Sequence, residues 1–290
     1  MAKGIAIIGL GLIGGSIGLA LKRAGSDGVE LVGCARRPET ADRALQLGAI
    51  DRVEGSLASA VNKADLVILA TPTMSVKEIL SQIGSHLPAG CVVTDVASTK
   101  VQVMKWAEES LPQSISFVGG HPMAGKELPG IEVADADLFR DCTYCVVPGR
   151  SASDDAVQAV VDLVNRIGAR PVFVNAAEHD QFVAGISHLP LVLASALVMA
   201  TTGNPHWSKM SELASTGYQG ATRLASQHPR MNRDICLTNG ENIVSWIDDF
   251  TKELQRFRGL IAEGDLGLEQ AFDRARQARN AWIEEHGKKS

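Results

Sequence analysis

The chain has 290 residues, 45% hydrophobic and 21% charged, which is the composition of a globular protein of about two domains. Its formal net charge of −5 gives no basic surplus for nucleic-acid phosphates, so we expect no nucleic-acid partner. The 28 glycines indicate many tight turns and argue against an all-helical protein.

Neither a membrane span nor a signal peptide is expected. The longest apolar run, residues 185–200, contains His188, Pro190 and Ser195 and therefore predicts a buried helix. The N-terminus runs directly into an apolar strand, without the charged flank and cleavable core of a signal peptide. We therefore expect no membrane partner and a cytoplasmic location.

The five cysteines are odd in number and scattered, which is typical of free thiols in a cytosolic protein. Cys142 and Cys145 have a redox or half-zinc spacing, but they lie in a predicted strand, where an offset of three places side chains on opposite faces. No second pair with zinc spacing follows, so we expect buried thiols and no metal.

Strand and helix patterns alternate over the first 175 residues. Strands are predicted at residues 3–8, 30–34, 66–70, 91–95, 116–118, 142–147 and 170–174. Helices are predicted at residues 13–24, 39–47, 76–83, 101–111 and 156–167. This alternation indicates βαβ units, so we predict an α/β fold with a Rossmann-type, mostly parallel sheet in a domain of residues 1–175. The short, wholly apolar strands fit a sheet covered on both faces.

From residue 176 onward the strand patterns disappear. Helices are predicted at residues 176–200, 208–214, 221–227, 232–261 and 268–285. Their apolar faces exceed what a small domain can hide by itself, which favours burial against a second copy of the chain. We predict an all-helical substrate and dimerisation domain over residues 176–290, and a homodimer.

A glycine motif follows the first strand directly and opens a helix. It consists of Gly9, Gly11 and Gly14, with Leu12 and Ile13 at the helix start. In this context the G-x-G-x-x-G spacing predicts a dinucleotide site, whereas a glycine-rich turn without ligand is the alternative. Gly9 permits the tight turn, Gly11 lets the backbone approach the pyrophosphate, and Gly14 lets helix and strand pack closely. The helix N-terminus supplies N–H groups to the phosphates.

The end of the second strand indicates the cofactor type. An NAD site normally has an acidic residue there, but this chain has Ala35 followed by Arg36 and Arg37. The two arginines favour the 2′-phosphate of NADP, with NAD and two solvated arginines as the alternative. Thr71 and Pro72 end another strand and are expected to form a wall beside the ribose or nicotinamide.

Three further residues are candidates for substrate chemistry. We expect His121, between glycines and Pro122, to be held in a rigid turn after a strand, where it could accept a hydroxyl proton. Spacing alone makes His188 a buried or interface residue. Arg223 follows a glycine-punctuated turn and is expected in the first turn of a helix. A cation there opposes the helix dipole, so we predict that Arg223 binds a carboxylate.

Five blocks of this sequence occur together in the order and spacing of one family. They are the Gly9–Gly14 start, Thr94-Asp95-x-x-Ser98-x-Lys100, Gly119-Gly-His121-Pro-Met-Ala-Gly125, Ser187-His-Leu-Pro190 and Gly217 through Thr222-Arg223. Together they resemble the prephenate/arogenate dehydrogenases of tyrosine biosynthesis over nearly the whole chain. The His-Pro-Met-Ala-Gly and Ser-His-Leu-Pro blocks are far more specific than the glycine motif.

The resemblance implies oxidative decarboxylation of prephenate to 4-hydroxyphenylpyruvate, or of arogenate to tyrosine, with hydride transfer to NADP or NAD. It gives His121 the role of proton acceptor, and makes Ser98 a partner of both the substrate hydroxyl and His121. By the same match Arg223 binds the substrate carboxylate. The resemblance also assigns to the substrate pocket His188, Glu127 and Gly217.

The sequence also departs from parts of the family. Ala35 and Arg36 replace the acidic strand end of NAD-specific members, and Asn232 stands where some relatives have a tryptophan. We expect neither a regulatory module after the helical region nor a fused chorismate mutase before Met1. Two other hypotheses are a β-hydroxyacid dehydrogenase-like oxidoreductase, which would rely on a helical-domain lysine, and a non-catalytic dinucleotide sensor. Neither has a use for His121.

Overall fold

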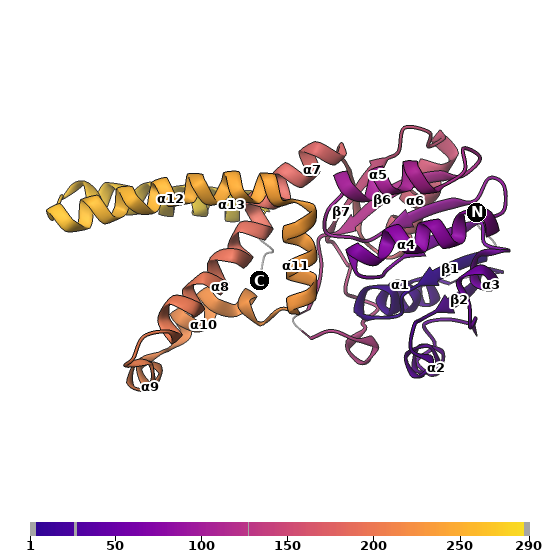
Figure 1. Cartoon of the computed structure of the whole chain (residues 1–290), viewed down its shortest axis with the longest axis horizontal. Coiled ribbons are helices and arrows are strands. Elements are labelled where there is room, and N and C mark those ends of the chain that lie inside the picture. Colours follow the sequence, from indigo (N-terminus) through magenta and orange to yellow (C-terminus); the bar gives the residue numbers. More distant parts are fainter. Residues whose placement is uncertain (1–3, 26–27, 127, 287–290) are drawn as a thin grey trace. The chain divides into compact units, whose positions relative to one another are not determined.

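The computed structural model describes residues 4–25, 28–126 and 128–286 (Figure 1). Contacts within the chain divide it into two compact units, Met1–Asn242 and Ile243–Ser290. The division expected at residue 175 lies inside the first unit, where strands give way to helices, and stays a prediction.

The first unit contains an eight-stranded sheet of order β3-β2-β1-β4-β5-β6-β7-β8. The strands are β1 Gly4–Ile8, β2 Glu30–Cys34, β3 Arg52–Val53, β4 Leu66–Leu69, β5 Val92–Asp95, β6 Ser116–Pro122, β7 Thr143–Pro148 and β8 Arg170–Phe173. All neighbours pair in parallel except β6 and β7. The predicted α/β fold with a Rossmann-type sheet is confirmed. Since β1, β4, β5 and β6 are parallel, their carboxyl ends meet at one edge.

Helices cover both faces of this sheet. They are α1 Leu12–Arg23, α2 Pro38–Gln46, α3 Leu57–Val61, α4 Thr73–Ile83, α5 Val101–Ser110 and α6 Asp154–Arg166. Apolar residues of α1, α2 and α6 form one core, and those of α3, α4 and α5 form the other. The strand β1 serves both, with Ile5 and Ile7 in the first core and Ala6 and Ile8 in the second. This alternation is what a sheet buried on both faces requires.

The helical part of the first unit begins with three consecutive elements, α7 Ala176–Val183, the π-helical turn η3 Ala184–His188 and α8 Leu189–Thr202. They are followed by α9 Trp207–Met210, η4 Ser211–Leu213, α10 Thr216–Thr222, η5 Arg223–Ser226 and α11 Pro229–Thr238. The helix predicted over residues 232–261 is interrupted at Asn239, whose side chain bonds to Asp180 and His188. Two short elements, β3 and α3, were not predicted because each is too short to show a periodic pattern.

The second unit consists of α13 Gly267–His286 and most of α12 Gly240–Glu263. A turn with Gly264 at a φ of 63° joins them, and the rings of Phe257 and Phe272 pack with centroids 5.3 Å apart. Apolar side chains such as Leu254, Ile261 and Trp282 are nevertheless exposed.

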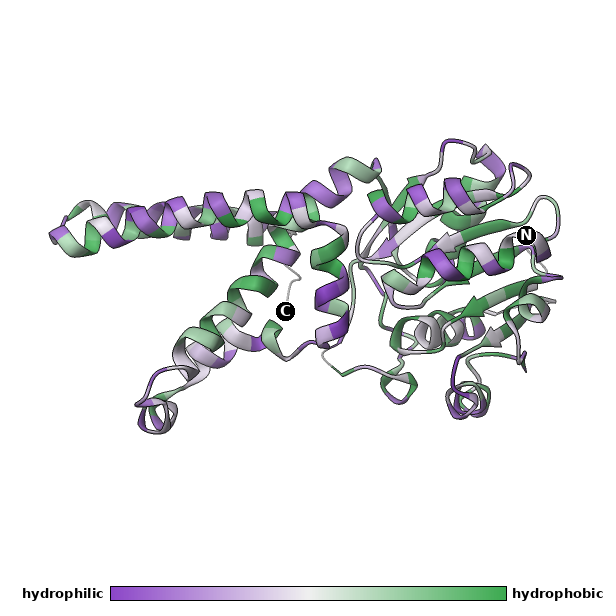
Figure 2. Cartoon of the chain, in the orientation of Figure 1, coloured by the Kyte–Doolittle hydropathy of each residue, from purple (hydrophilic) through white to green (hydrophobic). Residues whose placement is uncertain are grey.

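Among the described residues, one stretch, Ala176–Thr202, has the length and hydropathy of a membrane-spanning helix, with 33% of its apolar window buried in the chain. Figure 2 shows the apolar residues of α8 along the helix. The stretch contains the ionisable residues His179 and Asp180 near its start, and Pro190 in its middle. Ionisable side chains are rare on a helix that faces lipid. Apolar surface of this kind is equally suited to a protein partner.

Candidate active site

His121 lies inside β6, not in a turn after a strand, so that expectation was wrong. The strand continues through His121 because residues 118–122 pair with β7. A Cβ atom at Gly120 would lie 2.5 Å from the Asp95 carbonyl oxygen and 2.6 Å from Tyr144 Oη. Glycine therefore lets β6 approach β5 closely, and the strand carries His121 to the carboxyl edge of the sheet.

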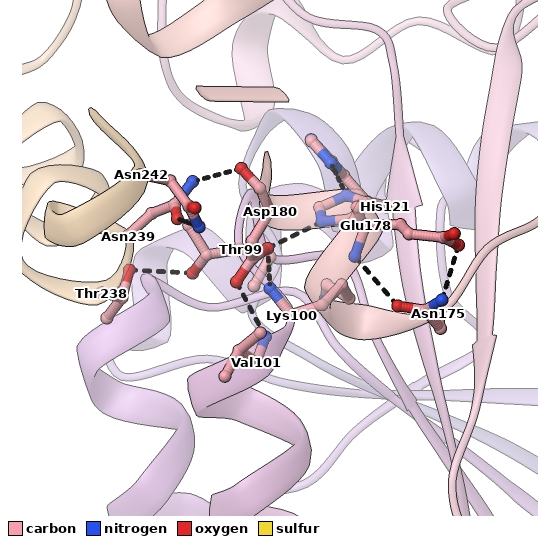
Figure 3. Close-up of polar contacts among 12 residues, drawn as sticks. Thr99, Lys100, Val101, His121, Asn175, Glu178, Asp180, Thr238, Asn239 and Asn242 are labelled. Atoms are coloured by element: carbon pink, nitrogen blue, oxygen red, sulfur yellow. Dashed lines mark hydrogen bonds and ion pairs between the residues drawn. The ribbon is translucent and has the colours of Figure 1, made fainter. Parts of the chain in front are cut away.

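The His121 ring is buried, with 9% of the residue exposed, and lies at the end of a polar chain (Figure 3). Its Nδ1 is 2.9 Å from His179 Nε2, and His179 Nδ1 is 2.8 Å from Asp180 Oδ1. Burial, followed by the neighbouring His179, Lys100 and His188, lowers the pKa of His121 well below its usual 6.5. His121 is therefore neutral at pH 7, as a proton acceptor must be.

Asp180 connects this series of hydrogen-bonded side chains to the start of α5. Its carboxylate accepts hydrogen bonds from the backbone N–H groups of Lys100, at 2.7 Å, and Val101, at 2.9 Å. A carboxylate at a helix N-terminus satisfies free donors and interacts favourably with the helix dipole. Since Asp180 belongs to α7, the contact fixes α7 against the loop between β5 and α5.

A buried ion pair lies on the other side of the same loop. The side chains of Lys100 and Asp95 are fully buried and bonded to each other. Lys100 Nζ also donates to the Gly120 carbonyl oxygen at 2.8 Å, and the Gly120 N–H donates to Asp95 Oδ1 at 3.1 Å. The pair therefore locks the backbone next to His121, and removing either partner would leave a buried charge unpaired.

His188 ends the π-helical turn and is 1% exposed. Asn239 Nδ2 donates to the Asp180 carbonyl oxygen at 2.7 Å and lies 3.2 Å from His188 Nδ1. Because an amide nitrogen only donates, His188 Nδ1 is the acceptor and its proton is on Nε2. Burial lowers the pKa of His188 to about 4, so the ring is neutral. Asn239 thus connects the two segments that carry His179 and His188.

The structure places Ser98 half-buried in the loop after β5, beside Thr99, whose hydroxyl is 2.8 Å from that of Thr238. Among the described residues, the ring-nitrogen partner of His121 is His179, so the predicted bond between Ser98 and His121 stays a prediction.

Arg223 does not lie in the first turn of a helix, so that expectation was wrong. The segment Thr216–Thr222 is itself the helix α10, and Arg223 is the residue at its C-terminal end, where the dipole favours a cation. Gly217 lies in the first turn of α10, and η5, which begins at Arg223, packs against α8. The role predicted for Arg223 thus rests on the sequence motif, and Glu127 lies outside the described residues.

The glycine motif has the geometry of a nucleotide cradle. Gly9 has a φ of 99°, and a Cβ atom there would lie 2.5 Å from the Ala70 carbonyl oxygen. A Cβ atom at Gly14 would lie 2.0 Å from the Gly9 oxygen, whereas one at Gly11 would meet nothing within 4 Å among the described residues. Gly9 and Gly14 are therefore required by the fold, and Gly11 leaves open space where the pyrophosphate is expected.

Other predicted cofactor residues border this cradle. Leu12 and Ile13 open α1, and Pro72 precedes α4. Thr71 Oγ1 is buried and has no hydrogen-bond partner among the described residues. Arg36 and Arg37 are exposed just before α2. The open space at Gly11, the orphaned Thr71 hydroxyl and the exposed arginines fit a dinucleotide.

Sequence reasoning missed His179, Asp180 and Asn239. One signal was available, because Asn175 and Glu178 mark a helix start and place His179, Asp180 and Val183 on the buried face of α7. Adjacent polar residues on a buried face need partners. Which partners they have depends on contacts between segments distant in sequence.

A two-part chain with a dinucleotide cradle and a buried histidine at the carboxyl edge of the sheet defines a nicotinamide-dependent dehydrogenase. The family models for the nucleotide-binding domain and the dimerization domain of prephenate dehydrogenase match residues 17–173 and 175–272. The chain belongs to the prephenate dehydrogenase family, whose members are enzymes.

Individual relatives agree with this membership. The chain is 35% identical to prephenate dehydrogenase of Bacillus subtilis over 97% of its own length and 76% of the relative. It is 34% identical to cyclohexadienyl dehydrogenase of Zymomonas mobilis, covering 98% and 97% of the two chains. The crystal structure of A. aeolicus prephenate dehydrogenase with hydroxyphenyl propionate and NAD+ superposes with a TM-score of 0.89 at 29% identity, covering 96% and 97% of the chains.

Proposed function

We propose that this enzyme catalyses the oxidative decarboxylation of prephenate or arogenate, with hydride transfer to NADP in preference to NAD. The observation that carries the proposal is His121, a buried and neutral histidine at the same sheet edge as the Gly9–Gly14 cradle. The relatives named for prephenate and cyclohexadienyl dehydrogenation support this assignment.

The proposed chemistry needs one proton acceptor. His121 takes the proton of the ring hydroxyl, and Ser98 orients that hydroxyl through a hydrogen bond. The nicotinamide, when bound, accepts the hydride that leaves the hydroxyl-bearing carbon. Loss of CO₂ makes the ring aromatic and supplies the driving force, so the protein mainly positions the substrate.

The remaining proposed site residues bind the substrate. Arg223 pairs with a carboxylate of the dianionic substrate, as its place in the family motif implies. His188, which carries its proton on Nε2, lines the pocket as a hydrogen-bond donor. By the family resemblance Gly217 and Glu127 also belong to the pocket, and Glu127 gates entry or meets an amino group.

The proposed NADP preference rests on Arg36 and Arg37, which are exposed before α2, and on the absence of an acidic residue at Ala35. Gly9, Gly11, Leu12, Ile13 and Gly14 hold the pyrophosphate, and Thr71 and Pro72 border the ribose or nicotinamide. Replacing Arg36 and Arg37 by serine should raise the KM for NADP about 10- to 100-fold and leave that for NAD unchanged. An unchanged KM for NADP would mean that the arginines are solvated, and would overturn the proposed NADP preference.

We also propose a homodimer formed through the helical region, located in the cytoplasm. The match of residues 175–272 to a dimerization domain supports the dimer. Exposed apolar side chains on α8 and α12, among them Met199 and Leu254, are consistent with it.

Steady-state kinetics with prephenate or arogenate, each with NAD or NADP, tests the proposal. An advantage in kcat/KM for one pairing assigns substrate and cofactor together. Turnover with none of the four pairings would overturn the proposed function.

A further inference from the structure

The polar chain that ends at His121 fixes which nitrogen of each ring carries a proton. The Asp180 carboxylate already accepts the N–H groups of Lys100 and Val101, and a carboxylate only accepts. The ring atom that faces it, His179 Nδ1 at 2.8 Å, therefore carries a proton. In the neutral ring His179 Nε2 is then an acceptor.

The proton on His179 Nδ1 also determines which nitrogen of His121 carries a proton. His121 Nδ1 lies 2.9 Å from the acceptor His179 Nε2, so Nδ1 of His121 is the donor and its Nε2 is unprotonated. We infer that His179 and Asp180 are positioning residues that hold His121 with Nε2 free to accept the substrate proton. They also stabilise the positive charge that develops when His121 takes it. This inference rests on the proposed role of His121 as the base.

Asp180 is the carboxylate connected to His121 through His179. The other titratable groups near His121 have partners of their own or are neutral. Lys100 is paired with Asp95, and His188 is held neutral with Nδ1 accepting from Asn239. On the neighbouring strand β7, Cys145 lies opposite His121 in the strand register, and burial raises the pKa of its thiol.

The ring protonation is measurable without substrate. In full-length protein labelled with ¹⁵N-histidine, NMR near pH 7.5 should show His121 with a protonated Nδ1 and an unprotonated Nε2. The signal is assigned by its loss in His121→Asn. A proton on Nε2 would overturn the inference, whatever activity the enzyme has.

A matched pair of variants tests the acceptor. His179→Gln keeps an amide oxygen that can accept from His121 Nδ1, whereas His179→Met has a similar volume without such an acceptor. We expect kcat of the Met variant to fall about 10- to 100-fold with KM within about twofold, and the Gln variant to keep most of its activity. Equal losses in both variants would contradict a role for the hydrogen bond.

The pH profile tests the charge. Asp180→Asn removes the anion that stabilises protonated His121, so the pKa of His121 falls. The acid limb of kcat/KM should then move to lower pH while kcat on the plateau decreases, and His86→Asn, at an exposed site, should change neither. An unchanged acid limb in folded Asp180→Asn would overturn the role of Asp180. Retained turnover in His121→Asn would instead overturn the proposed function and leave the NMR result standing.

Discussion

The sheet and the helices that follow it differ in how completely one chain buries them. Both faces of the sheet are covered, and apolar side chains on β1, β4 and β5 are almost entirely inaccessible. The helical elements after residue 175 bury far fewer and leave large apolar side chains exposed, including Ile186, Met199 and Leu237. Figure 2 shows apolar residues on these helices as well as inside the sheet.

Because the two regions differ in burial, substitutions in them should have different kinds of effect. The sheet and its glycine cradle are complete within one chain, so substitutions there should act locally. The helical region has more apolar surface than its own packing uses, so its substitutions should act on assembly.

The largest effect expected in the sheet region is that of His121→Asn. Loss of the base should lower kcat about 100- to 10,000-fold, while the dissociation constant for the dinucleotide and the oligomeric mass stay unchanged. Rapid kinetics, fluorescence titration and sedimentation measure the three quantities. Turnover near that of the unmodified enzyme would show that the proton goes elsewhere.

A charge on the exposed face of α8 tests the helical region. Met199 is 73% exposed in the single chain, and Met199→Glu should weaken the dimer about 100-fold or more, because an interface would bury an unpaired carboxylate. Sedimentation velocity over a range of concentrations measures this. Leu45→Glu, on the sheet-covering helix α2, is the control and should leave the mass unchanged. If both variants assemble alike, the contrast between the two regions fails.

The sequence predicted the sheet region more accurately than the helices after residue 175. The strands other than β3 could be located because each contains a short apolar run between turn residues. The order of the motifs located the cofactor cradle. The helices after residue 175 were placed less well, since α10 began five residues earlier than predicted. That shift moved Arg223 from a helix start to a helix end.

Within the site, motifs identified His121 and His188 but not the residues that orient them. His179 lies 58 positions from His121 in the chain, and Asn239 lies 51 positions from His188. Local periodicity contains no information about such pairs, because the partner of a buried polar group is set by tertiary packing.

A pH-dependent effect is expected from His188. Burial lowers the pKa of His188 from its usual 6.5 to about 4 in the fold, so the unfolded chain binds the proton first as the pH falls. The stability contributed by neutral His188 is present above pH 6.5 and is lost as the pH falls through 4. In His188→Asn the free energy of unfolding should decline by about 3 kcal/mol less between pH 7 and pH 4. Urea titrations measure this, with the exposed His86→Asn as control; equal declines would contradict the buried, neutral state.

The smallest expected effect on stability is that of Gly11→Ala. Compared with Gly14→Ala, it distinguishes glycines needed for the ligand from glycines needed for the fold. Gly11→Ala adds a Cβ atom into open space at a φ of −85°, so its free energy of unfolding should change by less than about 0.5 kcal/mol. Its dissociation constant for the dinucleotide should rise about tenfold, because the backbone approaches the pyrophosphate there. Gly14→Ala, with a Cβ atom 2.0 Å from the Gly9 oxygen, should lose stability by about 1–3 kcal/mol even without ligand. If Gly11→Ala bound the dinucleotide as tightly as the unmodified chain, the open space would not be the pyrophosphate site, although the sheet around it would be unchanged.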